Sequence, residues 1–330
     1  MDMANTQPSI AVQKHRMLRH AARRAVSGLP LLGLAPLLGG CQTALLDPKG
    51  PIGADEKSII ILATCLMLIV VVPVIVMTFG FAWRYRESNT RAVFAPNWAH
   101  SNKIEAVVWL VPCLIIAVLA TVTWISTHKL DPYRQIAARA KPIDVEVVSL
   151  DWKWLFIYPQ LQIASVNELA FPVDVPVRFH LTSSAVMNAF FIPRLGSQIY
   201  TMAGMETRLS LMANAPGTYR GISANYSGDG FSDMTFAARA MNAADFQKWI
   251  AQARAVPQKL TLAAYHRLVQ PSEKVPVAYY SGVQPKLFHD ILNQCADGAV
   301  CMDKSMKMSM ANEHPSGNGL SSAPRSKVLQ

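Results

Sequence analysis

Residues 59–83, IIILATCLMLIVVVPVIVMTFGFAW, contain no charged side chain. A second uncharged run, AVVWLVPCLIIAVLATVTWIST, covers residues 106–127. The hydrocarbon core of a bilayer is spanned by a helix of about 20 apolar residues. We therefore expect two membrane-spanning helices, at about 59–83 and 105–127. Pro73 and Pro112 lie inside them and are tolerated where neighbouring groups satisfy the freed carbonyls.

The loop between the two runs is basic and indicates the orientation. It carries Arg84, Arg86, Arg91 and Lys103 against a single Glu87. Because short loops rich in Lys and Arg stay in the cytoplasm, this loop is expected there. Both ends of the mature chain are then expected in the periplasm, with the hairpin in the inner membrane of a bacterium.

The N-terminus resembles a secretory leader that ends at a cysteine. An apolar run at 25–38 leads into Leu38-Gly39-Gly40-Cys41, and the residues before it are basic: Lys14, Arg16, Arg19, Arg23 and Arg24. A charged stretch, a short apolar stretch and small residues before the cleavage point are typical of a signal peptide. Small residues directly before Cys41 resemble a bacterial lipobox. We expect residues 1–40 to be a lipoprotein signal and Cys41 to carry the lipid; a buried helix that ends in an incidental cysteine is the alternative.

Composition is uninformative apart from these segments. The chain is 51% apolar, 16% charged and carries a formal charge of +10, of which the leader accounts for four. The remaining Lys and Arg are scattered, whereas nucleic-acid binding requires a basic patch or stripe. No nucleic-acid partner is expected.

After a polar connector that starts at residue 131, the pattern changes to short runs rich in β-formers. Gly, Pro, Asn and Asp separate these runs, which are expected as strands at 143–150, 152–158, 175–182, 208–212, 218–223 and 234–240. Many short strands with regular turn signals indicate a Greek-key β-sandwich, here a periplasmic domain at 131–240.

The rest of the chain is expected to be helical and then disordered. Phe246, Trp249 and Ile250 share one face of a helical pattern, and a second apolar helix is expected at about 286–292. We assign 241–305 to a C-terminal helical extension. Residues 306–330 are rich in Ser, Gly, Lys and Met, a composition typical of disorder.

Three motifs carry a resemblance to a known family. WAHSNKIE at 98–105 is followed by VVW at 107–109, WKWLFIYP lies at 152–159, and VMNAFFIPRL lies at 186–195. Together with the order of leader, helix, basic loop, helix and sandwich, they resemble subunit II of haem-copper oxidases over roughly residues 41–250. The resemblance implies a membrane-anchored α+β chain whose two-helix hairpin precedes a cupredoxin-like sandwich.

In the cytochrome c branch of that family, this domain holds a binuclear copper centre. Its ligands are two Cys, two His, a Met and a carbonyl beside a Glu. By the resemblance, the corresponding positions hold Asn188, Ser223, Asn225, Ser227, Phe231 and Met234. Amide, hydroxyl and phenyl groups do not replace thiolate and imidazole ligands of copper. A lone thioether, Met234, is expected to pack as a core residue. We expect no metal at these positions.

Without copper, the resemblance narrows to the bo-type ubiquinol oxidases. A quinol reaches the haem-bearing subunit through the bilayer and needs no external copper relay. The chain is then expected to hold no cofactor itself and to act as a non-catalytic subunit. Haems, copper and the quinol chemistry would belong to a partner subunit I, with smaller membrane subunits and membrane lipid around it.

Glu105 starts the second spanning helix on the cytoplasmic side. The resemblance implies the entrance of a proton pathway that continues in subunit I, and ionisable groups at such places are common proton relays. The alternative is a carboxylate that complements the helix dipole, worth about 0.3–1 kcal/mol.

Cysteines and methionines near the C-terminus leave alternatives open. Cys295 and Cys301 are a possible disulfide, because the periplasm is oxidising. A Met-rich segment follows, with Met302, Met306, Met308, Met310 and His314. It raises the alternative of a copper-carrier lipoprotein, and a copper-bearing cytochrome c oxidase subunit is the other. Trp152 and Trp154 are expected in the core of the sandwich.

Overall fold

A computed structural model describes residues 44–93 and 97–305. Helix α2 (Pro51–Arg84) and helix α3 (Asn102–Lys129) are long and apolar enough to cross a membrane, with mean hydropathies of 3.3 and 2.5 over an 18-residue window of each. Both contain the expected proline, and both extend beyond the predicted apolar windows at each end. The chain is a membrane-anchored protein. The predicted signal peptide, Cys41 and the tail 306–330 lie outside the described residues.

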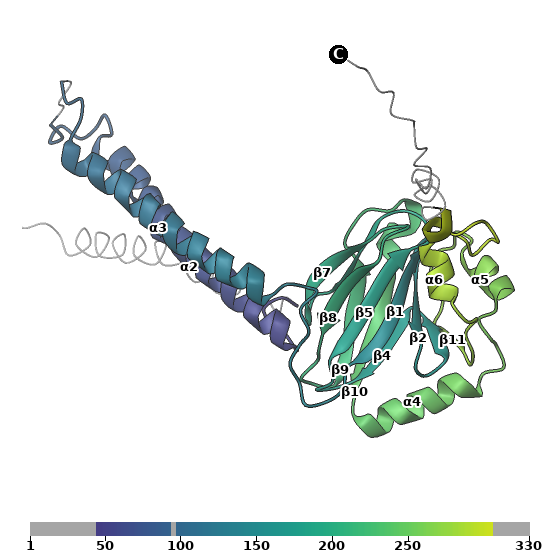
Figure 1. The fold of residues 1–330 in the computed structure, drawn as a ribbon. Coiled ribbons are helices and arrows are strands. Elements are labelled where there is room, and N and C mark those ends of the chain that lie inside the picture. Colours follow the sequence, from purple (N-terminus) through teal and green to yellow (C-terminus); the bar gives the residue numbers. More distant parts are fainter. Residues whose placement is uncertain (1–43, 94–96, 306–330) are drawn as a thin grey trace, which may run out of the picture. The chain divides into compact units, whose positions relative to one another are not determined.

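The β-rich part forms two sheets (Figure 1). The six-stranded sheet has the order β11-β3-β2-β1-β5-β8, and the five-stranded sheet has the order β4-β10-β9-β6-β7. The pairs β1–β5 and β4–β10 are parallel, and the other pairs are antiparallel. The predicted cupredoxin-like sandwich is confirmed. The strands are β1 (Ile143–Leu150), β2 (Lys153–Tyr158), β3 (Ile163–Val166), β4 (Glu168–Pro172), β5 (Val177–Ser183), β6 (Asn188–Ile192), β7 (Gly196–Thr201), β8 (Thr207–Leu211), β9 (Gly217–Ser223), β10 (Thr235–Met241) and β11 (Ala278–Tyr280).

The six expected strands are confirmed to within two residues at each end, whereas β3, β4, β6, β7 and β11 were missed. Every residue of β3 and β4 is buried. A short run buried on both faces shows no alternation of apolar and polar residues, so it cannot be recognised by periodicity. Strand β6 lies inside the motif at 186–195, where the sequence pattern predicts no strand.

The two sheets enclose an aromatic core. Trp154 is fully buried, with its ring centroid 5.4 Å from that of Phe190 and 5.6 Å from that of Phe236. Phe190 and Phe236 stack on each other at 5.1 Å. Such ring pairs contribute about 0.5–1.5 kcal/mol beyond the area that they bury. The prediction that Trp154 belongs to the core is confirmed.

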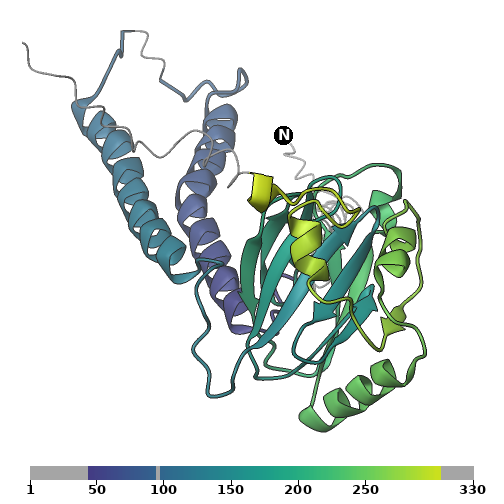
Figure 2. The same ribbon diagram turned by 45° about the vertical axis from the view of Figure 1, so that its right-hand side comes forward.

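Beyond β10, the chain first packs a helix against the main core cluster and then covers the outer face of the six-stranded sheet (Figure 2, in green and yellow). It forms α4 (Ala243–Ala255), α5 (Leu262–Leu268) and α6 (Leu287–Leu292), and it also adds β11 antiparallel to β3. The predicted buried face of α4 is confirmed, and so is the helix at about 286–292. An extension that contributes a strand to the sheet is part of the sandwich rather than a purely helical appendage.

Two buried charges connect this extension to the strands. Lys153, 1% exposed, donates from Nζ to the carbonyls of Asp151 (3.1 Å) and Gln270 (2.8 Å) and to Ser272 Oγ (2.6 Å). Burial lowers the pKa of this ammonium. Because all three donors have acceptors, the desolvation of the charge is compensated.

Glu168 at the start of β4 makes the second connection. Its Oε1 accepts from Trp249 Nε1 of α4 at 2.8 Å and from the Tyr279 hydroxyl of β11 at 2.6 Å. Arg239 of β10 donates to Oε2 at 3.4 Å. One carboxylate therefore joins both sheets and the extension.

Candidate functional site

The predicted copper-ligand positions lie at one end of the five-stranded sheet. Asn188 begins β6 and Ser223 ends β9, and these strands pair antiparallel, with Phe190 opposite Ser223. The other four positions lie between Ser223 and β10, in a segment that includes the short helix η1 (Asp229–Asp233). The sheet register therefore brings together residues that are far apart in the sequence.

Amide and hydroxyl groups satisfy one another in this cluster. Ser223 Oγ donates to Asn188 Oδ1 at 3.0 Å, and both residues are buried. Asn188 Nδ2 donates to the carbonyl of Val186 at 3.2 Å. Asn225 Nδ2 donates to the carbonyl of Met187 at 3.1 Å, which connects the two loops. A hydrogen-bonded network therefore connects Asn188, Ser223 and Asn225, three of the six predicted positions.

The remaining positions are filled by sulfur and aromatic packing. Met234 is 1% exposed, and its Sδ lies 4.0 Å from Ser227 Oγ. The ring of Phe231 packs edge-on against Tyr226, with centroids 5.6 Å apart. Among the six positions, no side chain is a thiolate, an imidazole or a carboxylate, so the donor set does not fit a copper centre.

Trp152 holds the loop that carries these residues. Its Nε1 donates to the carbonyl of Ser227 at 3.0 Å. A Cβ on Gly230 would lie 2.5 Å from the Trp152 ring, so the loop can approach only without a side chain there. Trp152 has φ 64° and precedes β2, and it is only half-buried. Its predicted place in a strand is therefore wrong: it lies in a tight turn, from which it packs against the main core cluster and onto the loop.

Glu105 lies in the first turn of α3, four residues after the N-cap Ser101. Its backbone N–H donates to Ser101 O at 2.9 Å. The side chain is exposed, and its carboxylate makes no hydrogen bond or ion pair with any described residue. The carboxylate is thus available to a neighbouring chain or to water.

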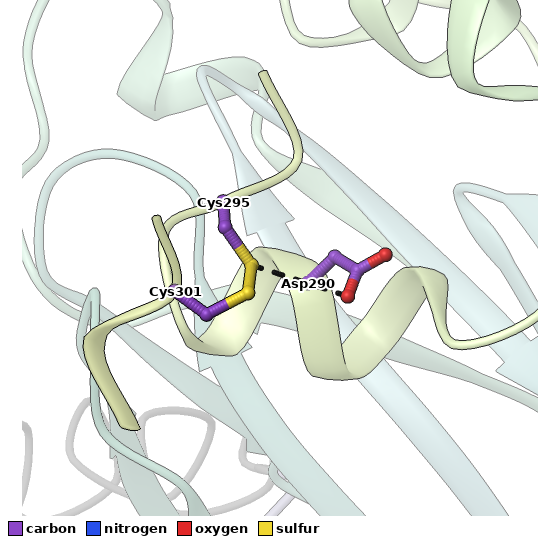
Figure 3. Close-up of side chains that lie close together, drawn as sticks. All are labelled: Asp290, Cys295 and Cys301. Atoms are coloured by element: carbon purple, nitrogen blue, oxygen red, sulfur yellow. Dashed lines mark hydrogen bonds between the residues drawn. A yellow bond between two sulfur atoms is a disulfide. The ribbon is translucent and has the colours of Figure 1, made fainter. Parts of the chain in front are cut away.

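Cys295 and Cys301 form a disulfide with an S–S distance of 2.09 Å, beside Asp290 of α6 (Figure 3). The sulfurs and the Asp290 carboxylate lie within 4.8 Å of one another. Metal binding by cysteine requires the thiolate, so the oxidised pair offers no ligands. The bond closes the end of the extension onto α6.

A charged cluster on β1, on β5 and at Glu206, the residue before β8, was not predicted. His180 Nδ1 lies 2.8 Å from Glu206 Oε1, and Arg178 forms a two-pronged ion pair with Asp144. Next to His180 in the register, Glu146 has its pKa raised to about 7, mainly by burial. The alternation of charged and apolar residues in 143–148 is a signal that could have located it.

The comparisons with known proteins agree with this geometry. Residues 143–241 match the family model "Cytochrome C oxidase subunit II, periplasmic domain", and residues 254–299 match the "COX Aromatic Rich Motif". The chain is 60% identical to a cytochrome bo(3) ubiquinol oxidase subunit 2 of Pseudomonas aeruginosa, over 81% of this chain and 82% of the relative. It belongs to the ubiquinol oxidase subunit 2 family.

One further relative and one solved structure are also similar to this chain. A ubiquinol oxidase subunit 2 of Acetobacter aceti is 51% identical over 88% of this chain and 94% of the relative. The periplasmic domain of subunit II of a cytochrome oxidase of Bradyrhizobium japonicum covers 36% of this chain and 96% of its own, with 21% identity and a TM-score of 0.33.

The match to the aromatic-rich motif accounts for the C-terminal extension, for which the sequence analysis predicts only helices. The aromatic-rich match spans the segment that covers the six-stranded sheet, where Tyr265 and Phe288 are buried and Tyr279 bonds to Glu168. The three tyrosines and one phenylalanine of this segment were the available signal.

Proposed function

We propose that this chain is subunit II of a ubiquinol oxidase complex that oxidises ubiquinol, reduces oxygen to water and translocates protons. The chain itself holds no redox centre; its role in the complex is to stabilise the structure and to admit protons. Haems and copper reside in the partner subunit I, which it accompanies with smaller membrane subunits. The observation that carries the proposal is the network of Asn188, Ser223 and Asn225 at the positions of copper ligands.

A copper relay serves electrons that arrive singly from an external cytochrome. A membrane-soluble quinol delivers its electrons within the bilayer, so the sandwich can lose its metal without interrupting electron supply. This reasoning disfavours a copper-bearing cytochrome c oxidase subunit. A copper-carrier lipoprotein would leave the paired spanning helices and Glu105 without a purpose, and most of its Met-rich segment lies outside the described residues.

The complex itself provides the test. A tagged full-length chain, purified in mild detergent, should bring a haem-bearing partner with it, and the preparation should consume oxygen when ubiquinol is supplied. Purification of the chain alone, or oxygen uptake driven only by reduced cytochrome c, would contradict the proposal.

Copper binding gives an independent test. The full chain incubated with copper should not develop the visible absorption of a thiolate-bridged centre. The positive control restores five ligands in one variant: Asn188→His, Ser223→Cys, Asn225→Glu, Ser227→Cys and Phe231→His. A thiolate–copper band in the unaltered chain would overturn the assignment to the quinol branch.

Glu105 is proposed as the proton entrance because it combines three properties. It lies in the first turn of α3 next to the basic loop, its carboxylate is exposed, and no described residue neutralises it. With the loop in the cytoplasm, the carboxylate can accept protons there and pass them to the neighbouring subunit.

The anchor is proposed to be double. Two spanning helices hold the chain in the inner membrane, and a lipid on Cys41 adds a second attachment, with both mature termini in the periplasm. Intact mass spectrometry of Cys41→Ser should show loss of the lipid while the chain stays in the membrane fraction. An unmodified mature N-terminus at another residue of the wild-type chain would disprove the lipid anchor.

A further inference from the structure

A cavity of about 200 Å³ lies where α2 begins, α3 ends and the connector passes β8. Backbone hydrogen bonds hold its walls. The N–H of Gly53 donates to Leu195 O at 2.9 Å, and Ser210 N–H donates to Pro132 O at 3.2 Å. Glu56 Oε1 accepts from both N and Oγ of Ser197, each at 2.8 Å. The cavity is therefore preformed, and it does not involve the positions discussed above.

Charges of both signs line this cavity. Lys129 Nζ lies 2.8 Å from Asp55 Oδ2, which leaves Oδ1 of Asp55 without an ion-pair partner among the described residues. Asp131 accepts the N–H of Tyr133 at 2.9 Å and closes a turn in which Arg134 N–H donates to Asp131 O, also at 2.9 Å. The exposed Arg134 guanidinium has no ion pair with any described residue. Two cations and two carboxylates thus border one cavity.

The cavity lies at the depth of lipid headgroups. Asp55 precedes the apolar window that starts at Ile59 by about 6 Å along the helix, and Lys129 follows the end of the second window by about 3 Å. The polar layer of a bilayer is about 5–8 Å thick on each side. Ligands at this place therefore meet lipid phosphates and amines rather than acyl chains.

We propose that this cavity binds the headgroup of a zwitterionic phospholipid such as phosphatidylethanolamine. The phosphate would contact Arg134 and Lys129, and the ammonium would contact Asp55 and Asp131. Sites for whole small molecules are typically about 300–1,000 Å³, so a 200 Å³ cavity fits a headgroup and excludes an entire quinol. Ile52 and Leu209 provide apolar wall for the glycerol carbons.

Native mass spectrometry of the delipidated complex, titrated with phosphatidylethanolamine or phosphatidylglycerol, tests the proposal. Phosphatidylglycerol carries the same phosphate without the ammonium. The wild type should bind phosphatidylethanolamine more tightly, and Arg134→Ala should weaken that binding by about tenfold, because a hydrogen-bonded charge pair is lost. Arg139→Ala is the matched control, since Arg139 is an exposed arginine of the same connector that does not line the cavity.

Two further experiments identify the source of the ligand and the charged group of the headgroup that the cavity recognises. Asp55→Asn should reduce the preference for phosphatidylethanolamine over phosphatidylglycerol, because it removes a partner of the ammonium. Equal binding of the two lipids by the wild type, or equal loss in Arg134→Ala and Arg139→Ala, would overturn the proposal. Soluble phosphoethanolamine should compete with the lipid for the cavity. Arg134-dependent binding of inorganic phosphate without any lipid binding would show that the cavity binds a soluble anion, and it would refute the proposal of a lipid ligand.

Discussion

Replacing Glu168 by alanine should destabilise the sandwich more than any single change of a surface carboxylate. The side chain is 9% exposed, and it accepts hydrogen bonds from Trp249, Tyr279 and Arg239. Removing it leaves an indole N–H and a phenol O–H without an acceptor. Each unsatisfied buried group costs about 1–3 kcal/mol, and loss of the Arg239 ion pair adds little because the Arg239 side chain is 44% exposed. We expect a loss of about 4 kcal/mol.

Urea unfolding of the full-length chain in detergent, followed by tryptophan fluorescence, measures this loss. With a slope of about 2 kcal/mol per M, the midpoint should fall by about 2 M. The partly conservative Glu168→Gln keeps an acceptor and should lose less than half as much. Glu273→Ala, at an exposed carboxylate of the same extension, is the control and should change stability by less than about 0.5 kcal/mol. If Glu168→Ala unfolds at the same urea concentration as this control, the carboxylate does not hold the extension to the sheets.

The remaining predictions concern proton entry, pH dependence and the loop at the copper-ligand positions. Glu105→Gln should leave the haem content and subunit ratio of the complex normal but slow ubiquinol-driven oxygen uptake several-fold. The control Glu87→Gln, in the loop, should not slow oxygen uptake. Wild-type turnover in Glu105→Gln would show that this carboxylate is only a helix-end charge worth at most about 1 kcal/mol. Burial raises the pKa of Glu146 from 4.5 to about 7. The folded state therefore holds this proton more tightly than the unfolded chain does. The contribution of the protonated carboxyl to stability is complete below about pH 4.5 and is lost as the pH rises through 7. Glu146→Gln should remove this pH dependence and stabilise the chain at pH 8 by about 1–2 kcal/mol after allowance for solvent screening, as read from melting curves at pH 5 and pH 8; an unchanged difference between the two curves would contradict it. Gly230→Ala should destabilise the chain by about 1–3 kcal/mol, because its Cβ would meet the Trp152 ring at 2.5 Å, and the double variant with Trp152→Ala should recover part of the loss in the same unfolding assay.

Local signals in the sequence were sufficient for the membrane helices and for half of the sandwich. The two uncharged windows predict α2 and α3 because the absence of charge over about 20 residues is a property of a single segment. Strands such as β1 and β5, which have turn residues at their ends, were also recognisable. The replacement of copper ligands could be proposed from motifs alone, since Ser223, Ser227 and Met234 lie within one short stretch.

Only the tertiary structure decided what these residues touch. The hydrogen bond between Asn188 and Ser223 depends on the register of β6 against β9, and no local pattern specifies that register. The role of Glu168 depends on three partners that lie 71, 81 and 111 residues away along the chain. The mixed-charge cavity arises where the helix ends and the connector meet β8. Helices and strands are determined by short-range periodicity, whereas sites are determined by which distant segments the packed core brings together, and the sequence shows only the first directly.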